Sequence, residues 1–350
     1  MGPVRLGDDP FVNDPKMFYD IIQRRRNWAN ASFCCGAGSI HRREAVMEAA
    51  LRSFGDKVQK RTWEAEETIT VASKEREVAP ELMQAIKTEA AATEILTPYR
   101  FHVSEDIYTS IVLHSDHERG WKSKMHPIVE SKMLSPQDLV TWTVQRFKYA
   151  GGSLDILVHD NPLFRKGLSL PQRLMYAMTF YSYLAPLWNV IFLVSPVVYL
   201  FSGISPVSAY SADFFLHLIP FLVTLELAIM VGTWGIDGYP SKASYLSFFP
   251  LGLRALWTVA RGKTISFKVT PKVRQSGFFL PLVLPQIAVI VLTLLGAIWG
   301  IGALFTGGTD HSASGVLANT LWGLNNCFAM AGIIAAAMWR PVEDEEDQSK

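Results

Sequence analysis

The sequence has almost no excess of either charge, since 33 lysines and arginines stand against 32 aspartates and glutamates in 350 residues. A nucleic-acid-binding domain normally carries a basic excess, so this balance argues against that class of protein. Cysteines are also few: Cys34, Cys35 and Cys327. Two of them are sequence neighbours, so no disulfide framework is expected, and the polar part is predicted to lie in a reducing compartment. The first residues contain no apolar run, so no cleavable signal peptide is expected.

The second half of the chain is poor in charge of both signs. Residues 1–170 hold 46 charged side chains, 23 of each sign, whereas residues 171–350 hold 19. The core of a soluble protein does not require so uncharged a segment. The composition therefore predicts a membrane protein with a polar domain in front of its membrane part.

Four apolar stretches are long enough to span a bilayer, which takes roughly 20 helical residues. They are predicted at 183–201, 214–234, 278–305 and 316–339. Lysine and arginine are absent from the loops 202–213 and 306–315, whereas the loop 235–277 contains seven. The positive-inside rule then predicts that this loop, the N-terminal domain and the acidic tail 340–350 are cytoplasmic.

Several other segments have helical patterns. Asp138–Ala150 and Tyr245–Val259 are amphipathic and suit either the membrane surface or ordinary packing within a domain. Residues 48–100 are highly charged and predict one or two amphipathic helices, for example Ala79–Ala92.

The segment Phe101–Leu113 is expected to pass from an extended stretch into a helix capped by Ser104. Glu105 and Asp106 then lie in the first turn, where the helix dipole favours carboxylates. Capping alone explains these two carboxylates. A ligand site at the end of an extended segment is the other interpretation, since α/β domains place ligands there.

Five motifs occur in order along the chain: FCCG followed by HRREA, then SED, then QRFKY, then membrane spans, then FKVTPK. This order resembles the bacterial cellulose synthase catalytic subunits, which are processive family 2 glycosyltransferases. That family shows FFCG, an arginine-rich helix start, TED, Q-x-x-R-W on an interface helix and F-x-V-T-x-K in a gating loop. The resemblance runs from about Asp14 to Phe305.

The resemblance implies a role for each matching residue. Asp106, with Glu105 beside it, matches TED and is expected to be the general base for the acceptor hydroxyl. The residues that match substrate-binding positions are Cys35 and Gly36 at the acceptor end, Gln145, Lys148 and Tyr149 on the interface helix, with Arg146 beside them, and Phe267, Val269, Thr270 and Lys272 in the gating loop.

Some positions depart from the family pattern. Ser104 replaces threonine and keeps a hydroxyl, and Tyr149 replaces tryptophan. Lys148 replaces arginine, which keeps the charge but loses the planar two-point grip on phosphate, and Arg146 can compensate. Residues 48–100 resemble an insertion. No D-x-D segment precedes Phe33, so the family's Mg²⁺ is expected to have no ligands in this chain.

The implied fold is a partial α/β, GT-A-like cytoplasmic domain at 1–135, interface helices at 136–182 and the membrane region 183–339. The implied activity is inverting, processive extension of a β-linked glucan from UDP-glucose, coupled to export across a bacterial inner membrane, with this chain inactive by itself. The partners are the UDP-sugar donor, the growing polysaccharide, the lipid bilayer and a periplasmic or membrane accessory subunit. The alternatives are a related synthase that uses another UDP-sugar, and a non-catalytic membrane scaffold or channel remnant.

Overall fold

The structure is a computed structural model that describes residues 16–36, 38–73, 79–92, 95–99, 102–131, 135–136, 138–205, 211–236, 238–263, 265, 279–307 and 310–338. The chain divides into two compact units. The polar unit comprises Arg26–Lys132 and Asn161–Tyr176. The spanning unit comprises Met1–Arg25, Met133–Asp160 and Ala177–Lys350.

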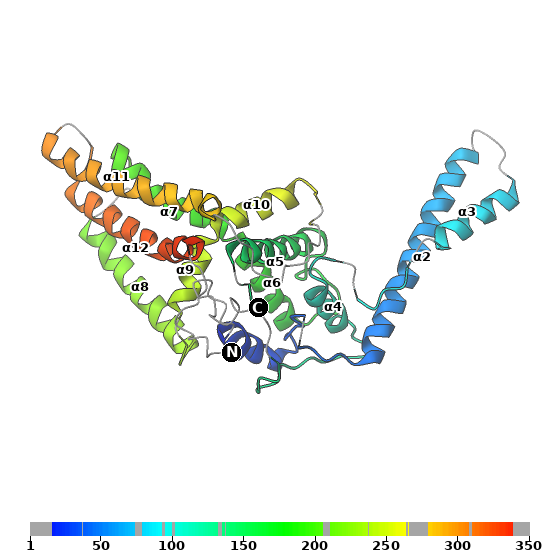
Figure 1. The fold of residues 1–350 in the computed structure, drawn as a ribbon. Coiled ribbons are helices and arrows are strands. Elements are labelled where there is room, and N and C mark those ends of the chain that lie inside the picture. Colours follow the sequence, from blue (N-terminus) through cyan, green and yellow to red (C-terminus); the bar gives the residue numbers. More distant parts are fainter. Residues whose placement is uncertain are drawn as a thin grey trace, which may run out of the picture. The chain divides into compact units, whose positions relative to one another are not determined.

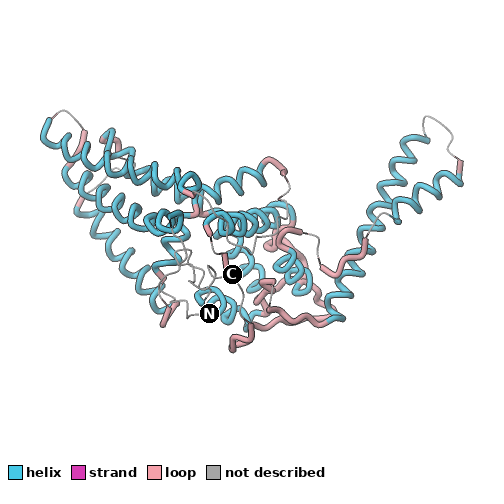
Figure 2. Tube along the Cα trace, in the orientation of Figure 1, coloured by secondary structure: helices cyan, strands magenta, loops and turns pink. Residues whose placement is uncertain are grey.

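Helices make up the regular structure of the described residues, as Figures 1 and 2 show. After the short turns η2 (Met17–Gln23), α1 (Arg24–Arg26) and η3 (Asn27–Ala29) come α2 (Arg43–Ser73), α3 (Pro80–Ala92), α4 (Glu105–His114), α5 (Leu139–His159) and α6 (Leu170–Tyr181). The remaining elements are η4 (Ser182–Leu184), α7 (Pro186–Ser202), α8 (Ala212–Gly232), α9 (Tyr239–Ser247), α10 (Phe249–Ala260), η5 (Leu280–Val283), α11 (Leu284–Thr306) and α12 (Ala313–Met338).

The expectation of a partial α/β domain is wrong for the described part of the chain, which contains no strand. The physical reason is that side chains, and not a neighbouring strand, form hydrogen bonds with the extended backbone here. Asn27 uses its side-chain amide to donate to the Met125 carbonyl at 3.0 Å and to accept from the Met125 N–H at 2.7 Å. Asn30 pairs in the same way with the backbone on either side of Lys122, at Trp121 and Ser123. Side chains thus take the place of a neighbouring strand.

The charged segment forms the expected helices. α2 and α3 lie antiparallel as a hairpin, and Lys87 of α3 pairs with Glu66 of α2 at 2.6 Å. At the base of the hairpin, Arg52 pairs with Asp116 at 3.2 Å, which ties α2 to the loop after α4. The prediction of one or two helices in residues 48–100, including one close to Ala79–Ala92, is confirmed.

Within the described ranges, four helices or helix pairs are long and apolar enough to cross a membrane: Leu170–Ser202, Ala212–Gly232, Leu280–Thr306 and Ala313–Met338. They match the four predicted spans, although the first candidate begins earlier than expected. The two amphipathic segments are also helical. Asp138 caps α5 by accepting from the Thr141 backbone N–H at 2.7 Å, and the helix continues to His159. The second segment divides at Phe248 into α9 and α10.

Helices α7, α11 and α12 pack side by side in the spanning unit. Gly296 and Gly300 of α11 face α7, where an added Cβ would lie 3.1 Å from Leu200 Cβ and 3.2 Å from Leu200 O, respectively. The spacing is that of the small-residue motif by which membrane helices approach closely. Polar side chains also cross between helices, since Asn326 donates to the Phe192 carbonyl at 3.2 Å and Gln286 donates to the Ser247 carbonyl at 2.9 Å.

Helix α10 docks against the beginning of α7 through a glycine. A Cβ on Gly252 would lie 2.2 Å from Cγ of Pro186, the first residue of α7. Phe249, Ala255 and Val259 are buried on the same side of α10, which also packs against α5. Helix α5 is thereby held beside the membrane-type bundle.

Replacing Gly252 with valine should destabilise the spanning unit because the new side chain overlaps Pro186. Overpacking of this kind costs roughly 1–3 kcal/mol. The matched control is Gly302→Val in α11, where an added Cβ meets no atom within 4 Å among the described residues. Thermal unfolding of the purified chain in detergent should show a lower midpoint for Gly252→Val than for the control; equal midpoints would contradict this contact.

Candidate functional site

The loop 32–36 is fastened to the first turn of α4 by one serine. The backbone N–H of Cys34 donates to Ser110 Oγ at 2.9 Å, and Ser110 Oγ donates to the backbone carbonyl of Asp106 at 2.9 Å. Ser110 is buried, so both hydrogen bonds are shielded from water. This link brings the FCCG loop beside the carboxylate of SED.

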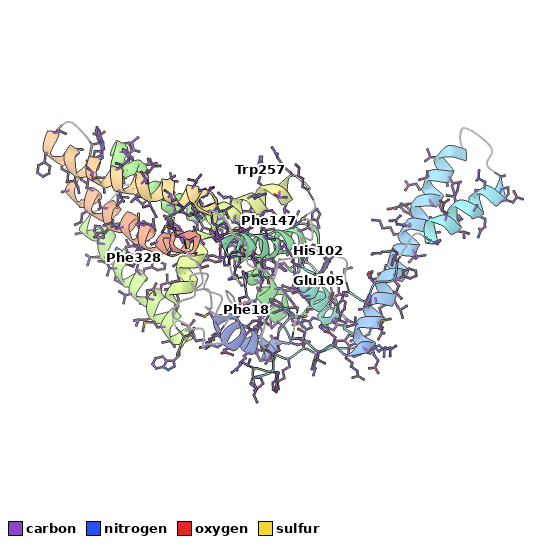
Figure 3. All side chains as sticks on the ribbon, in the orientation of Figure 1. Phe18, His102, Glu105, Phe147, Trp257 and Phe328 are labelled. Atoms are coloured by element: carbon purple, nitrogen blue, oxygen red, sulfur yellow. The ribbon has the colours of Figure 1, made fainter. Side chains whose placement is uncertain are left out.

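Gly36 and Asp106, two predicted site residues, come together at this point. Gly36 has a φ of +86°, which favours glycine, and an added Cβ would lie 3.7 Å from Asp106 Oδ2. The other oxygen, Oδ1, accepts from the backbone N–H of Ile107 at 2.8 Å. Figure 3 labels Glu105, the neighbouring carboxylate, and His102 near the start of α4. Ser104 is at the predicted N-cap position, but its side chain forms no cap hydrogen bond.

The environment of Asp106 favours its protonated form. Burial raises the pKa of this carboxyl, and the negative charge of Glu105 adds to the effect, whereas the N–H of Ile107 and the charge of His102 act in the opposite direction. A carboxylate with a raised pKa is a stronger base than a solvated one. Asp106 is therefore chemically suited to accept a proton from a hydroxyl group.

Cys34 and Ser110 are two further candidate site residues, which the motifs did not indicate. The Cys34 thiol lies 3.2 Å from Ser39 Oγ and 3.4 Å from His41 Nε2, and burial raises its pKa, so it is a thiol rather than a thiolate at neutral pH. Ser110 lies one helical turn after Asp106, and this spacing is the signal that could have identified it. Cys35 is half-buried, and its thiol donates to the Phe33 carbonyl at 3.4 Å.

A buried chain of hydrogen bonds supports the same loop from behind. Tyr176 OH lies 2.7 Å from His114 Nδ1, and His114 Nε2 lies 2.8 Å from Ser123 Oγ, which donates to the Ser32 carbonyl. Since the proton of Ser123 is used on Ser32, His114 donates from Nε2 and accepts from the tyrosine at Nδ1. The imidazole is thus neutral, and burial lowers its pKa to about 4.

The predicted residues Gln145, Arg146, Lys148 and Tyr149 form a separate cluster on α5 of the spanning unit. Tyr149 is exposed and the other three are half-buried. The guanidinium of Arg146 lies 5.6 Å from the ring centre of Trp142. Among the described residues, the buried Nε of Arg146 meets no hydrogen-bond partner.

The gating-loop residues Phe267, Val269, Thr270 and Lys272 lie outside the described residues. The described residue nearest to them, Ile265, packs on α5: a Cβ added to Gly151 would lie 2.7 Å from Ile265 Cδ1. Ile265 therefore contacts α5 at Gly151, two residues after Tyr149.

The described residues contain no group of three or more His, Cys, Asp or Glu side chains that could hold a metal ion. Glu105 and Asp106 alone do not fit the near-octahedral oxygen set that Mg²⁺ requires. A pocket of about 230 Å³ lies between α2, residues 95–99 and α4, and is lined by Phe54, Tyr99 and Tyr108 among others. Asp106 does not line it.

These features define a multi-span membrane-type protein whose polar unit presents a half-buried carboxylate. The chain is 25% identical over 328 residues to the UDP-forming cellulose synthase catalytic subunit of Komagataeibacter sucrofermentans. The matched region covers 91% of this chain and 36% of that protein. The chain is 24% identical over 335 residues to the corresponding subunit of Pseudomonas fluorescens, covering 93% and 38%. Cellulose synthase 1 of Komagataeibacter xylinus is 26% identical over 330 residues, covering 91% and 18%.

The chain is a distant homologue of bacterial cellulose synthase catalytic subunits. It spans little more than a third of the length of the catalytic subunits it matches, and about a fifth of the longer cellulose synthase 1. No family model matches it.

Acid should destabilise the polar unit through His114. The histidine has its ordinary pKa of 6.5 when unfolded and a pKa of about 4 when folded, so below pH 6.5 the unfolded chain binds more protons. Stability should therefore fall by about 3 kcal/mol as the pH drops through this window. Denaturant unfolding at a series of pH values should show this slope in the parent chain and in the exposed control His159→Gln. A similar dependence of the unfolding free energy on pH in His114→Gln would show that His114 is not its cause.

Proposed function

We propose that this chain is the acceptor-side and channel portion of a membrane-embedded, inverting, processive glycosyltransferase. The substrates are UDP-glucose and the growing β-linked glucan, and synthesis is coupled to export of the polymer. The observation that carries the proposal is the approach of Gly36 to the half-buried carboxylate of Asp106. The FCCG and SED motifs meet there, in a chain distantly homologous to cellulose synthase subunits over most of its length.

In this mechanism Asp106 accepts the proton of the acceptor hydroxyl as its oxygen attacks the anomeric carbon of the donor. The glycosyl–phosphate bond breaks and the nucleoside diphosphate leaves, which inverts the anomeric configuration. Ser110 is a positioning residue, because its hydroxyl fixes the Asp106 backbone relative to the loop 34–36. Cys35 and Gly36 line the acceptor end.

The α5 residues Gln145, Arg146, Lys148 and Tyr149 are proposed to bind the donor diphosphate and stack on the terminal sugar. Lys148 supplies a point charge, and the half-buried guanidinium of Arg146, held over Trp142, supplies directed donors for phosphate oxygens. Phe267, Val269, Thr270 and Lys272 close over the nucleotide in this proposal. The packing of Ile265 on Gly151 supports it, since that contact starts the loop from the helix that carries these residues.

The proposed domain organisation has residues 1–135 as the acceptor-side domain with a helical insertion at 48–100, residues 136–182 as interface helices and 183–339 as the membrane region. The proposed location is a bacterial inner membrane, with the polar domain, the loop 235–277 and the tail in the cytoplasm. Four membrane-type helices and the cation-rich loop support this topology. A periplasmic or membrane accessory subunit is the proposed protein partner.

Two rival functions remain distinguishable. A related synthase that uses a UDP-N-acetylhexosamine would share Asp106 and differ in the sugar incorporated, so product analysis with each donor separates it. A non-catalytic scaffold or channel remnant would not need the contact between Gly36 and Asp106. Retention of this contact together with FKVTPK favours the enzyme.

The 350-residue chain by itself should make no polymer from UDP-glucose with Mg²⁺, because no D-x-D segment precedes Phe33 in it. Incorporation of radiolabelled glucose into insoluble glucan, measured with the purified chain in lipid nanodiscs, checks this. Measurable polymer above a boiled-protein blank would contradict the proposal that this chain supplies only the acceptor-side and channel portion.

Asp106→Asn should abolish polymer formation where the donor-binding part is supplied in the same polypeptide or complex. Loss of a general base lowers the turnover rate by roughly 10²–10⁴-fold. Binding of UDP should change little, because the amide keeps the size of the side chain. The matched control is Glu118→Gln, an exposed carboxylate beyond the end of α4. Synthesis by Asp106→Asn at the parent rate would remove the general-base role.

A further inference from the structure

One exposed face of α10 combines cations with an aromatic ring. Arg254, Trp257 and Arg261 are spaced three and four residues apart, so they lie on one side of the helix, opposite the buried Gly252 and Ala255. Lys263 lies three residues beyond the end of α10 and is exposed. Trp257 is 60% exposed and projects from α10 in Figure 3. These four residues are called the α10 cationic face below.

The arginines of this face are held against aromatic rings. The guanidinium of Arg254 lies 5.2 Å from the ring centre of Phe147 on α5, and that of Arg261 lies 4.3 Å from the ring centre of Trp257. Such contacts orient each guanidinium while its outward N–H groups stay available to an anion. No acidic residue occurs anywhere from 238 to 263, whereas four cations do, so the sequence around the face supplies no competing carboxylate.

The position of α10 is set by a membrane-type helix. Gly252 lies against Pro186, which is the first residue of α7 and lies near the start of the sequence-predicted span 183–201. At the same end of α7, Trp188 stacks on Tyr181 with ring centres 5.1 Å apart, as expected for aromatics at the edge of a bilayer. Helix α10 therefore lies at the level where a span begins, which is the depth of lipid headgroups.

We propose that the α10 cationic face binds the phosphate headgroup of an anionic phospholipid. Arg254, Arg261 and Lys263 provide the positive charge, and Trp257 inserts its ring among the glycerol and upper acyl groups. The binding holds α10 on the membrane surface and, with it, the segment that leads to Ile265. The inference rests on α7 crossing a bilayer and not on glycosyl transfer, so it can fail or succeed independently of the proposed function.

The test measures the dissociation constant of fluorescently labelled phosphatidylglycerol for the purified full chain in an uncharged detergent, with labelled phosphatidylcholine as the comparison. Each cation near an anionic lipid contributes about a fivefold gain in affinity. The parent chain should therefore bind phosphatidylglycerol more tightly, by up to roughly a hundredfold for three cations. Sodium chloride should reduce this difference by screening.

The variant Arg254→Gln/Arg261→Gln/Lys263→Gln should bind both lipids equally. The matched control Lys57→Gln/Lys60→Gln/Arg61→Gln removes three exposed cations from α2 and should keep the preference. If the triple variant does not fold, Arg261→Gln alone should lose about fivefold in affinity for phosphatidylglycerol, because Arg261 is exposed.

Three results would overturn the proposal. Equal affinity of the parent chain for the two lipids would show that charge is not recognised. An unchanged preference in the triple variant would place the lipid elsewhere. Release of phosphatidylglycerol by sodium diphosphate, beyond that caused by sodium chloride at the same ionic strength, would show that the face binds a soluble phosphate compound instead.

Discussion

The spanning unit depends on close approach between helices at positions without side chains. Lipid tails are as apolar as leucine, so apolar burial does not drive helices together in a bilayer, and backbone proximity must supply the contact. Gly296 and Gly300 allow α11 to reach the backbone of α7, and Gly252 allows α10 to reach Pro186. Because α5 packs on α10, these contacts also set the position of the residues proposed to bind the donor.

In the polar unit, whose described residues form no strand, side chains provide the hydrogen-bond partners of the extended backbone. Asn27 and Asn30 pair with the backbone at 121–125, and Ser110 pairs with the backbone of Cys34. A single serine hydroxyl thereby connects the FCCG loop to the SED helix. The local geometry of the candidate base follows from this connection, since the loop covers Asp106 and the burial raises its pKa.

Both candidate sites described above use helices that serve packing on one side and chemistry on the other. Helix α4 buries Ile107 and Ile111 and presents Asp106 to the loop. Helix α10 buries Phe249, Ala255 and Val259 and presents its cationic face outward. In each case the apolar side fixes the helix, and the remaining side chains are then held in one direction. A charged group placed in this way loses little conformational entropy when a ligand binds.

The sequence by itself determined the number of membrane-type helices among the described residues, the helices within residues 48–100 and the helices that carry the SED and QRFKY motifs. Each of these follows from local composition or period, because a run of apolar residues or a helical repeat is written in neighbouring residues. The prediction of a partial α/β domain was wrong for the opposite reason. A strand requires a partner strand, which can lie far away in the sequence. Local pattern does not specify whether extended backbone pairs with a strand or with a set of side chains.

Only the tertiary structure decided which residues stand beside Asp106, why His114 stays neutral and which glycines carry the helix contacts. Gly36 lies 70 positions before Asp106 in the sequence, and Tyr176 lies 62 positions after His114. The same holds for Arg254 and Phe147, which meet across two helices. Such contacts depend on how the helices dock, and docking is set by the shapes of both surfaces at once, which no local pattern contains.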